Sequence, residues 1–224
     1  FAKKVLRSPA DVDQLEAPNP RKEGLLPFVI KRLQHLQPEI EADGTKVFNL
    51  TAAITDWEVS PGNVVKAWTY NGQVPGPWIR VEPGDRVRVN LTNNLPISTE
   101  IHWHGIDVPF DQDGVAPITQ DYVRPLETYT YEYTVQDNPG MGMFHAHFHG
   151  QVGIVNGLFG IFQVGDVPLP LGRTVGNVAS PADLDVTTIQ EVPMVLNDAG
   201  VIGLSLNGKS FPATQPIAAK EGEL

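Results

Sequence analysis

The sequence predicts an all-β domain of the sandwich or barrel type. Its strand-like segments are short, turn-forming Gly, Pro, Asn and Asp fill the gaps between them, and no long helices alternate with them. In residues 129–135 tyrosine rings alternate with polar residues, as a half-buried strand requires. The predicted strands are 47–54, 64–70, 86–90, 128–135 and 158–164.

Composition excludes several classes of protein. A length of 224 residues accommodates one sandwich, which needs about 100 residues, together with extensions. The net charge of -10 argues against a nucleic-acid partner. No apolar run approaches the roughly 18 residues that a membrane span needs, so none is predicted. The absence of cysteine excludes disulfides, thiolate metal sites and a cysteine nucleophile.

Changes of pattern along the chain predict four parts. Residues 1–45 are rich in Pro and charge, and we expect an arm with a short helix between Pro27 and Pro38. Residues 46–164 form the predicted sandwich. Residues 165–185 sustain neither period and are predicted to be a linker. Residues 186–224 are predicted to begin a second, incomplete sandwich.

That closing part contains an internal repeat. A strand-like pattern resumes at 186–196, and residues 204–212 then repeat the strand, Asn-Gly turn and Pro of residues 69–77. The segment is too short to bury a core of its own. We therefore expect its apolar residues to pack against a further polypeptide or to complete a sheet elsewhere.

Histidines are the strongest functional signal. Residues two apart on a strand project from one face, so a His-X-His pair offers two imidazoles to one site. Two such pairs on neighbouring strands would surround one volume with nitrogen ligands, which suits Cu, Zn, Fe or Ni rather than Ca or Mg. Five of the six histidines fall in two groups, namely His102 with His104, and His145, His147 and His149. The sixth, His35, is expected at the surface.

The alternative is a set of ordinary polar residues on an exposed strand face. Trp103, Ala146 and Phe148 have the opposite parity and are expected to enter the core, which favours a free histidine face and a metal site. His149 shares parity with the second pair, but Gly150 follows it and the strand is expected to turn there. His149 is therefore a secondary ligand candidate.

The two histidine motifs resemble those of the multicopper oxidases of the laccase kind, whose first cupredoxin domain carries His-X-His-Gly and then aromatic-His-X-His. The resemblance spans roughly residues 46–164 and implies a cupredoxin-like Greek-key β-sandwich. The closing segment resembles the start of the family's next cupredoxin domain. The matching segments are 71–77, 81–85, 102–105, 113–114, 119–120, 144–147 and 157–160.

Carried over by position, the resemblance implies roles for five residues. His102 would bind the type 2 copper, and His104, His145 and His147 would bind the type 3 pair. Asp113 matches an acidic residue that helps to deliver protons during oxygen reduction. The alternative for Asp113, which Gly114 follows, is an ordinary Asp-Gly turn.

One further residue departs from the family pattern, and two methionines leave alternatives open. Asp121 stands where the family usually has a cysteine, but that cysteine is not a copper ligand, so the implied ligands are unaffected. Met141 and Met143 could be soft copper(I) ligands, although filling of the core is the alternative.

The implied activity is a copper-dependent oxidation of a phenol, an aromatic amine or a metal ion, coupled to four-electron reduction of dioxygen to water. The chain holds four of the eight histidines of a trinuclear cluster and lacks the cysteine of a type 1 site. We expect a C-terminal remainder or companion chain to supply them. One arrangement is a homo-oligomer, as in trimeric two-domain laccase-like relatives whose cluster forms between subunits. The chain alone should be inactive. The resemblance implies an extracytoplasmic protein, periplasmic or secreted.

Three other classes remain open at this point. A copper-binding or copper-carrier protein would bind the metal without oxidase turnover. A nitrite reductase-like copper enzyme shares the fold, but its first domain contains a type 1 cysteine. A zinc hydrolase would need a carboxylate ligand that the sequence does not indicate.

Overall fold

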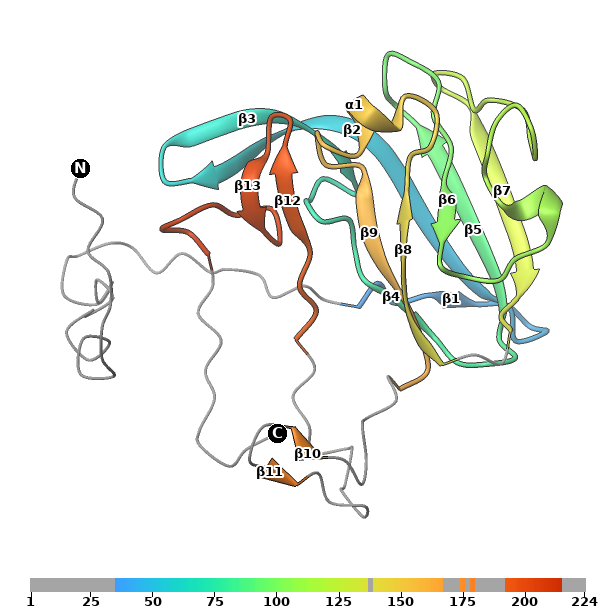
Figure 1. Ribbon diagram of the computed structural model, residues 1–224. Coiled ribbons are helices and arrows are strands. Elements are labelled where there is room, and N and C mark those ends of the chain that lie inside the picture. The colour runs from blue at the N-terminus through green and yellow to red at the C-terminus, as the bar shows by residue number, and fades with distance from the viewer. Residues whose placement is uncertain (1–34, 137–138, 167–173, 176–177, 180–191, 215–224) are drawn as a thin grey trace. The chain divides into compact units, whose positions relative to one another are not determined.

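Two β-sheets pack face to face in the computed structural model, which confirms the predicted all-β sandwich (Figure 1). The structure describes residues 35–136, 139–166, 174–175, 178–179 and 192–214. In this part of the chain, no helix is both long and apolar enough to cross a membrane. The strands are β1 (Glu39–Ile40), β2 (Lys46–Ser60), β3 (Asn63–Tyr70), β4 (Ile79–Val81), β5 (Arg86–Asn93), β6 (His102–His104), β7 (Thr128–Thr134), β8 (Gly140–His145), β9 (Phe159–Val164), β10 (Thr174–Val175), β11 (Val178–Ala179), β12 (Leu196–Ala199) and β13 (Gly203–Leu206), and the helices are η2 (Phe110–Gln112) and α1 (Gly150–Gly153).

Both main sheets mix parallel and antiparallel pairing. The first has the order β1-β2-β5-β7, with β3 also paired to β2, and its β2–β5 pair is parallel. The second has the order β4-β9-β8-β6, and its β4–β9 pair is parallel. Strands that pair in these sheets are often not consecutive in the sequence. In the second sheet, for example, β6 pairs with β8.

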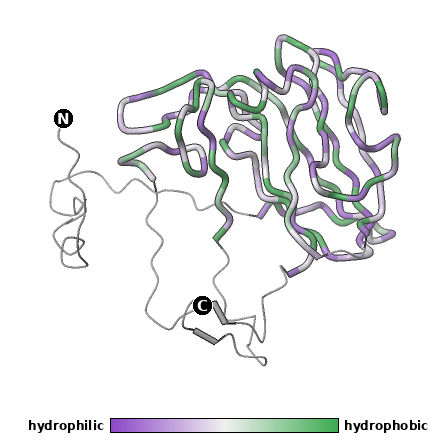
Figure 2. The backbone as a smooth tube through the Cα atoms, viewed as in Figure 1, coloured by the Kyte–Doolittle hydropathy of each residue, from purple (hydrophilic) through white to green (hydrophobic). Residues whose placement is uncertain are grey.

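Aromatic side chains fill the space between the sheets. Trp103 of β6 is 1% exposed, and its ring centroid lies 5.4 Å from that of Tyr131 and 5.5 Å from that of Phe162. Figure 2 shows hydrophobic residues along the strands of both sheets. Because aromatic pairs of this kind add about 0.5–1.5 kcal/mol beyond the burial of their area, Trp103 anchors β6. The residues on either side of it therefore face away from the core.

The predicted strands of the sandwich are confirmed, and most are longer than expected. In β7 the alternation of tyrosines matches burial, since Tyr131 and Tyr133 are buried and Tyr129 is half-buried. Among the described residues, the strand predicted over 186–196 is found only at Leu196, the first residue of β12. Residues 192–195 are outside any strand, and residues 186–191 lie outside the described part of the chain.

The segment before β1 also differs from expectation. Of the predicted helix between Pro27 and Pro38, only residues 35–38 are described, and they are not helical. His35 forms a parallel bridge with Trp78, and the two ring centroids lie 3.8 Å apart. His35 is therefore half-buried rather than a surface histidine.

The internal repeat reappears as one turn geometry used twice. Asn71 and Asn207 both have positive φ, of 54° and 50°, and each is followed by a positive-φ glycine. Each asparagine Oδ1 accepts a backbone N–H from an earlier residue, that of Thr51 at 2.7 Å and that of Val195 at 2.8 Å. The turn that follows β3 is therefore built again after β13.

The hairpin of β12 and β13 packs against the edge of the sandwich at β2. Trp57 Nε1 donates to the Gly208 carbonyl over 2.7 Å, and the Lys209 ammonium lies 4.2 Å from the centroid of the Trp57 ring. The Ser210 N–H donates to the Val59 carbonyl over 2.8 Å. The start of the predicted second domain is thus bound to the first sandwich. Within the predicted linker 165–185, β10 and β11 form a short antiparallel pair, and residues 167–173, 176–177 and 180–185 lie outside the described part.

Candidate metal centre

The register of β6 against β8 brings the two histidine motifs together. His102 lies opposite His145, and Trp103 lies opposite Phe144. Both aromatic residues are buried, so the pleat sends the histidines to the other face. The prediction that the histidine pairs lie on neighbouring strands is confirmed for His102, His104 and His145.

The second histidine pair is not wholly on a strand. Strand β8 ends at His145, and His147 lies in the loop that leads to α1. Phe148 is half-buried, with its ring centroid 4.5 Å from that of Tyr122, so the expectation that it enters the core was wrong. The reason is that strand alternation stops where pairing with β6 ends.

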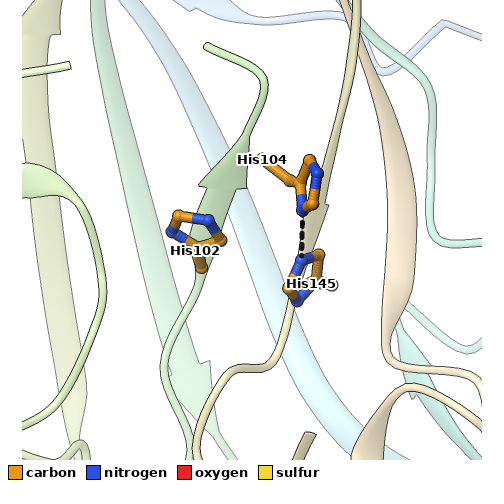
Figure 3. A group of neighbouring side chains, drawn as sticks. All are labelled: His102, His104 and His145. Carbon is orange, nitrogen blue, oxygen red and sulfur yellow. Dashed lines mark hydrogen bonds between the residues drawn. The ribbon is translucent and has the colours of Figure 1, made fainter. Parts of the chain in front are cut away.

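Three imidazoles converge at this place (Figure 3). One ligand nitrogen from each of His102, His104 and His145 lies within 4.8 Å of the other two. The closest pair is His104 Nδ1 and His145 Nε2, which are 3.3 Å apart. His145 is buried and His104 is exposed, so the group lies at the boundary between core and solvent.

Backbone carbonyls determine the tautomers of two of these rings. His102 Nδ1 lies 2.9 Å from the Asp113 carbonyl oxygen, and His145 Nδ1 lies 3.0 Å from the Ala146 carbonyl oxygen. Because a carbonyl oxygen only accepts, each Nδ1 carries the proton and donates it. In the neutral ring, Nε2 then keeps its lone pair, which is the arrangement that second-sphere partners produce in metal-ligating histidines.

Burial keeps His145 in the neutral form that binds metal. It lowers the pKa of His145, and nearby His102, His104 and His147 lower it further, against the opposing effect of the Ala146 hydrogen bond. A neutral imidazole is the ligand form, because protons compete with the metal for the nitrogen.

The donor set fits a copper ion. His104 Nδ1 and His145 Nε2 lie 3.3 Å apart, so these two rings would hold one ion between them. All three donors are imidazole nitrogens, which copper accepts well.

The other predicted site residues lie around this group. The His147 ring centroid is 5.5 Å from that of His102, but His147 is outside the group of three. His149 is exposed, has a φ of 51° at the start of α1, and its ring centroid lies 4.1 Å from that of Phe148. The structure does not bring His149 into the group. Asp113 Oδ1 lies 3.3 Å from His102 Nδ1, so its carboxylate adjoins the first histidine.

Two further residues bear on the site. Met143 is half-buried and packs against the smaller core cluster, as core filling requires, whereas Met141 is 49% exposed. Glu100 was not predicted, yet its carboxylate is buried against the backbone of His147. Glu100 has the same parity as His102 and His104, but parity alone does not indicate that Glu100 is buried.

Comparison with known proteins places these features in a family. The sequence profile of a family described as multicopper oxidase matches residues 51–168, which is more than half of the chain. The chain belongs to the multicopper oxidase family. Both histidine motifs and Asp113 lie inside the matched region of this multicopper oxidase chain.

Individual relatives agree in sequence and in structure. A laccase of Pestalotiopsis fici is 38% identical over 110 residues, covering 48% of this chain and 18% of its own length. The blue copper oxidase of Nitrosomonas europaea has a TM-score of 0.66 at 28% identity, covering 80% of this chain and 58% of the other. The multicopper oxidase mgLAC has a TM-score of 0.62 at 34% identity with the same coverage. These structural neighbours confirm the cupredoxin-like fold expected from the sequence.

The matches cover part of a larger architecture. The chain spans less than a fifth of the length of the first curated relatives that it matches, with shares of 18%, 16% and 18%. The similarity therefore covers one part of those proteins and does not extend to their whole length.

Proposed function

We propose that this chain supplies half of the ligand set of a trinuclear copper cluster, in an oxidase that couples one-electron oxidation of a small reductant to reduction of dioxygen to water. In this assignment His102 binds the type 2 copper, and His104, His145 and His147 bind the type 3 pair. The reductant is a phenol, an aromatic amine or a metal ion.

One observation carries the proposal. Imidazoles from two adjacent antiparallel strands converge with 3.3 Å between His104 Nδ1 and His145 Nε2, and backbone carbonyls hold the rings of His102 and His145. An ordinary exposed strand face would not need such second-sphere support. Membership of the multicopper oxidase family supports copper as the metal.

Bound copper would supply electron transfer and a binding site for dioxygen. The residues of this chain hold that site and manage protons. The Asp113 carbonyl accepts the His102 Nδ1 proton and so orients the ring. The Asp113 carboxylate, 3.3 Å from the same nitrogen, is proposed to exchange protons with solvent beside the His102 ring.

The remaining ligands are proposed to come from a further polypeptide, either a C-terminal remainder or a companion chain that carries the type 1 site. A homo-oligomer, including a trimer, is one form of this arrangement. The segment that contains β12 and β13 supports it, because Met194, Leu196 and Leu204 are 58%, 71% and 71% exposed. Apolar side chains gathered at one place favour a partner surface. We also propose an extracytoplasmic location.

Oxygen uptake tests the proposal. The chain 1–224 loaded with copper should show no sustained dioxygen consumption with a phenol or with Cu(I), because it has no cysteine and only four of the eight cluster histidines. The complete assembly should consume dioxygen with the same reductants. Sustained turnover by the isolated chain would contradict the ligand count, and copper binding without turnover by the assembly would favour a copper carrier.

Asp113→Asn should leave copper content near that of the wild type while slowing oxygen reduction by roughly 100-fold or more, the range of general acid catalysis. The defect should grow as pH rises, because solvent protons become scarcer. The measurement is steady-state oxygen uptake against pH. Asp111→Asn is the matched control, since Asp111 is an exposed acid two residues away. If both variants follow the wild-type profile, Asp113 is only a turn residue.

A further inference from the structure

A buried carboxylate lies directly behind the candidate copper site. Glu100 is 0% exposed and stands two residues before His102, which opens β6. A carboxylate is rarely buried to this extent unless specific partners stabilise its charge. Its partners therefore indicate why it is there.

Those partners are backbone amides of the second histidine motif. Glu100 Oε1 accepts the N–H of His147 over 2.8 Å and also the N–H of Phe148. The other oxygen, Oε2, is buried and has no hydrogen-bond partner among the described residues. Burial raises the pKa of Glu100, and the Phe148 and His147 amides, with His102, act in the opposite direction.

The backbone that carries Glu100 is itself held in place. The Ile101 N–H donates to the Tyr131 hydroxyl over 2.8 Å, and the Tyr70 hydroxyl donates to the Glu100 carbonyl over 3.5 Å. Both tyrosines are fully buried in the core. The Glu100 side chain thus extends from a fixed point.

The loop that it contacts lacks the support of a β-ladder. Strand β8 ends at His145, and the pairing of β8 with β6 ends at the same residue. His147 and Phe148 follow outside any strand, and their amides are satisfied by a single side-chain oxygen from the β6 side. This link joins the backbone before the first histidine motif to the backbone of the second.

We propose that Glu100 is a positioning residue that fixes the His147 backbone relative to His102, His104 and His145. Its carboxylate takes the place of the missing strand partner, and it acts through the backbone rather than by touching copper. The consequence for copper binding by His147 rests on the proposed function. The effect of Glu100 on the conformation of the loop does not depend on the proposed function.

Three variants of the full polypeptide separate the possibilities. Glu100→Gln keeps the length and an acceptor oxygen, Glu100→Asp keeps the charge but is one methylene shorter, and Glu100→Leu keeps the bulk without an acceptor. In the copper-free protein we expect hydrogen exchange at the His147 and Phe148 amides to accelerate at least about tenfold in the Asp and Leu variants, as loss of hydrogen bonds to a charged group predicts. Exchange in the Gln variant should stay near the wild-type rate.

Copper titration supplies the second readout. We expect about 10- to 100-fold weaker copper binding in the Asp and Leu variants, the usual effect of losing a second-sphere partner, and near-normal binding in Glu100→Gln. Thr69→Val is the control for general destabilisation, because Thr69 is fully buried on β3 and its hydroxyl donates to the Ala53 carbonyl. Thr69→Val should change neither the copper affinity nor the hydrogen exchange at the His147 and Phe148 amides.

Unchanged amide exchange in both Glu100→Asp and Glu100→Leu would overturn the proposal, as would equal acceleration in Thr69→Val. If Glu100→Leu does not fold, Glu100→Asp against Glu100→Gln decides the matter. A wild-type protein that binds no copper would refute the proposed function, while the exchange data would still judge the role of Glu100 in the loop.

Discussion

Replacing His104 by alanine is expected to lower copper affinity at the cluster by at least about 100-fold, which exceeds the usual loss from second-sphere changes. His104 is exposed, so its removal leaves the core untouched. It removes the Nδ1 atom that faces His145 Nε2 at 3.3 Å, which is the closest pair of donors in the group. Copper content by mass spectrometry and competition titration with a chelator measure the effect.

His149→Ala is the matched control for this substitution. It changes the same type of residue, also exposed, in the loop beside the site but outside the group of three. Copper affinity should stay within a few-fold of the wild type. Equal copper content and affinity in His104→Ala and the wild type would exclude His104 as a ligand.

Gly114→Ala is expected to destabilise the fold by about 3 kcal/mol or more and to displace His102. Gly114 has a φ of 71°, and a Cβ there would lie 1.6 Å from the Ile101 carbonyl oxygen. Backbone atoms cannot move aside as a flexible side chain can, so the turn after Asp113 and the start of β6 must separate. The Asp113 carbonyl that accepts from His102 Nδ1 would move with that turn.

Chemical denaturation and copper titration of Gly114→Ala test this expectation. Gly62→Ala is the control, because Gly62 has a φ of 75° with nothing within 4 Å of the position of a Cβ. It should cost only the conformational penalty of about 1–2 kcal/mol and leave copper binding unchanged. If the two variants lose the same stability and both retain copper, close packing at Gly114 does not support the site.

Sequence reasoning captured the parts of the site that follow from strand alternation. Parity predicted that His102 and His104 share one face while Trp103 enters the core, and the structure agrees. The resemblance to multicopper oxidases identified Asp113, which does adjoin His102. These features depend on strand alternation or on a specific motif, and a single sequence contains both kinds of information.

Features that depend on where a strand ends were not predictable in this way. Alternation was extended through residue 149, but the partner strand ends opposite His145, so His147, Phe148 and His149 follow loop geometry instead. Glu100 was missed because a lone acid beside a His motif is usually a solvated residue, and only the fold shows that it is buried.

The docking of the closing hairpin was likewise beyond a local pattern. Its apolar residues were expected to seek a partner, and Met194, Leu196 and Leu204 are indeed exposed. Ile202, however, is buried in a cluster with Val59 of β2. Contacts between residues so far apart in sequence arise from tertiary packing, which periodicity does not encode.

A crystal structure of the copper-loaded full polypeptide, with anomalous scattering recorded at the copper absorption edge, tests the central claim most directly. The account predicts copper peaks bonded to His102 Nε2, to His104 Nδ1 and to His145 Nε2. It also predicts a bond to the His147 ring and none to His149. Copper peaks elsewhere, with these four rings free of metal, would contradict the assignment.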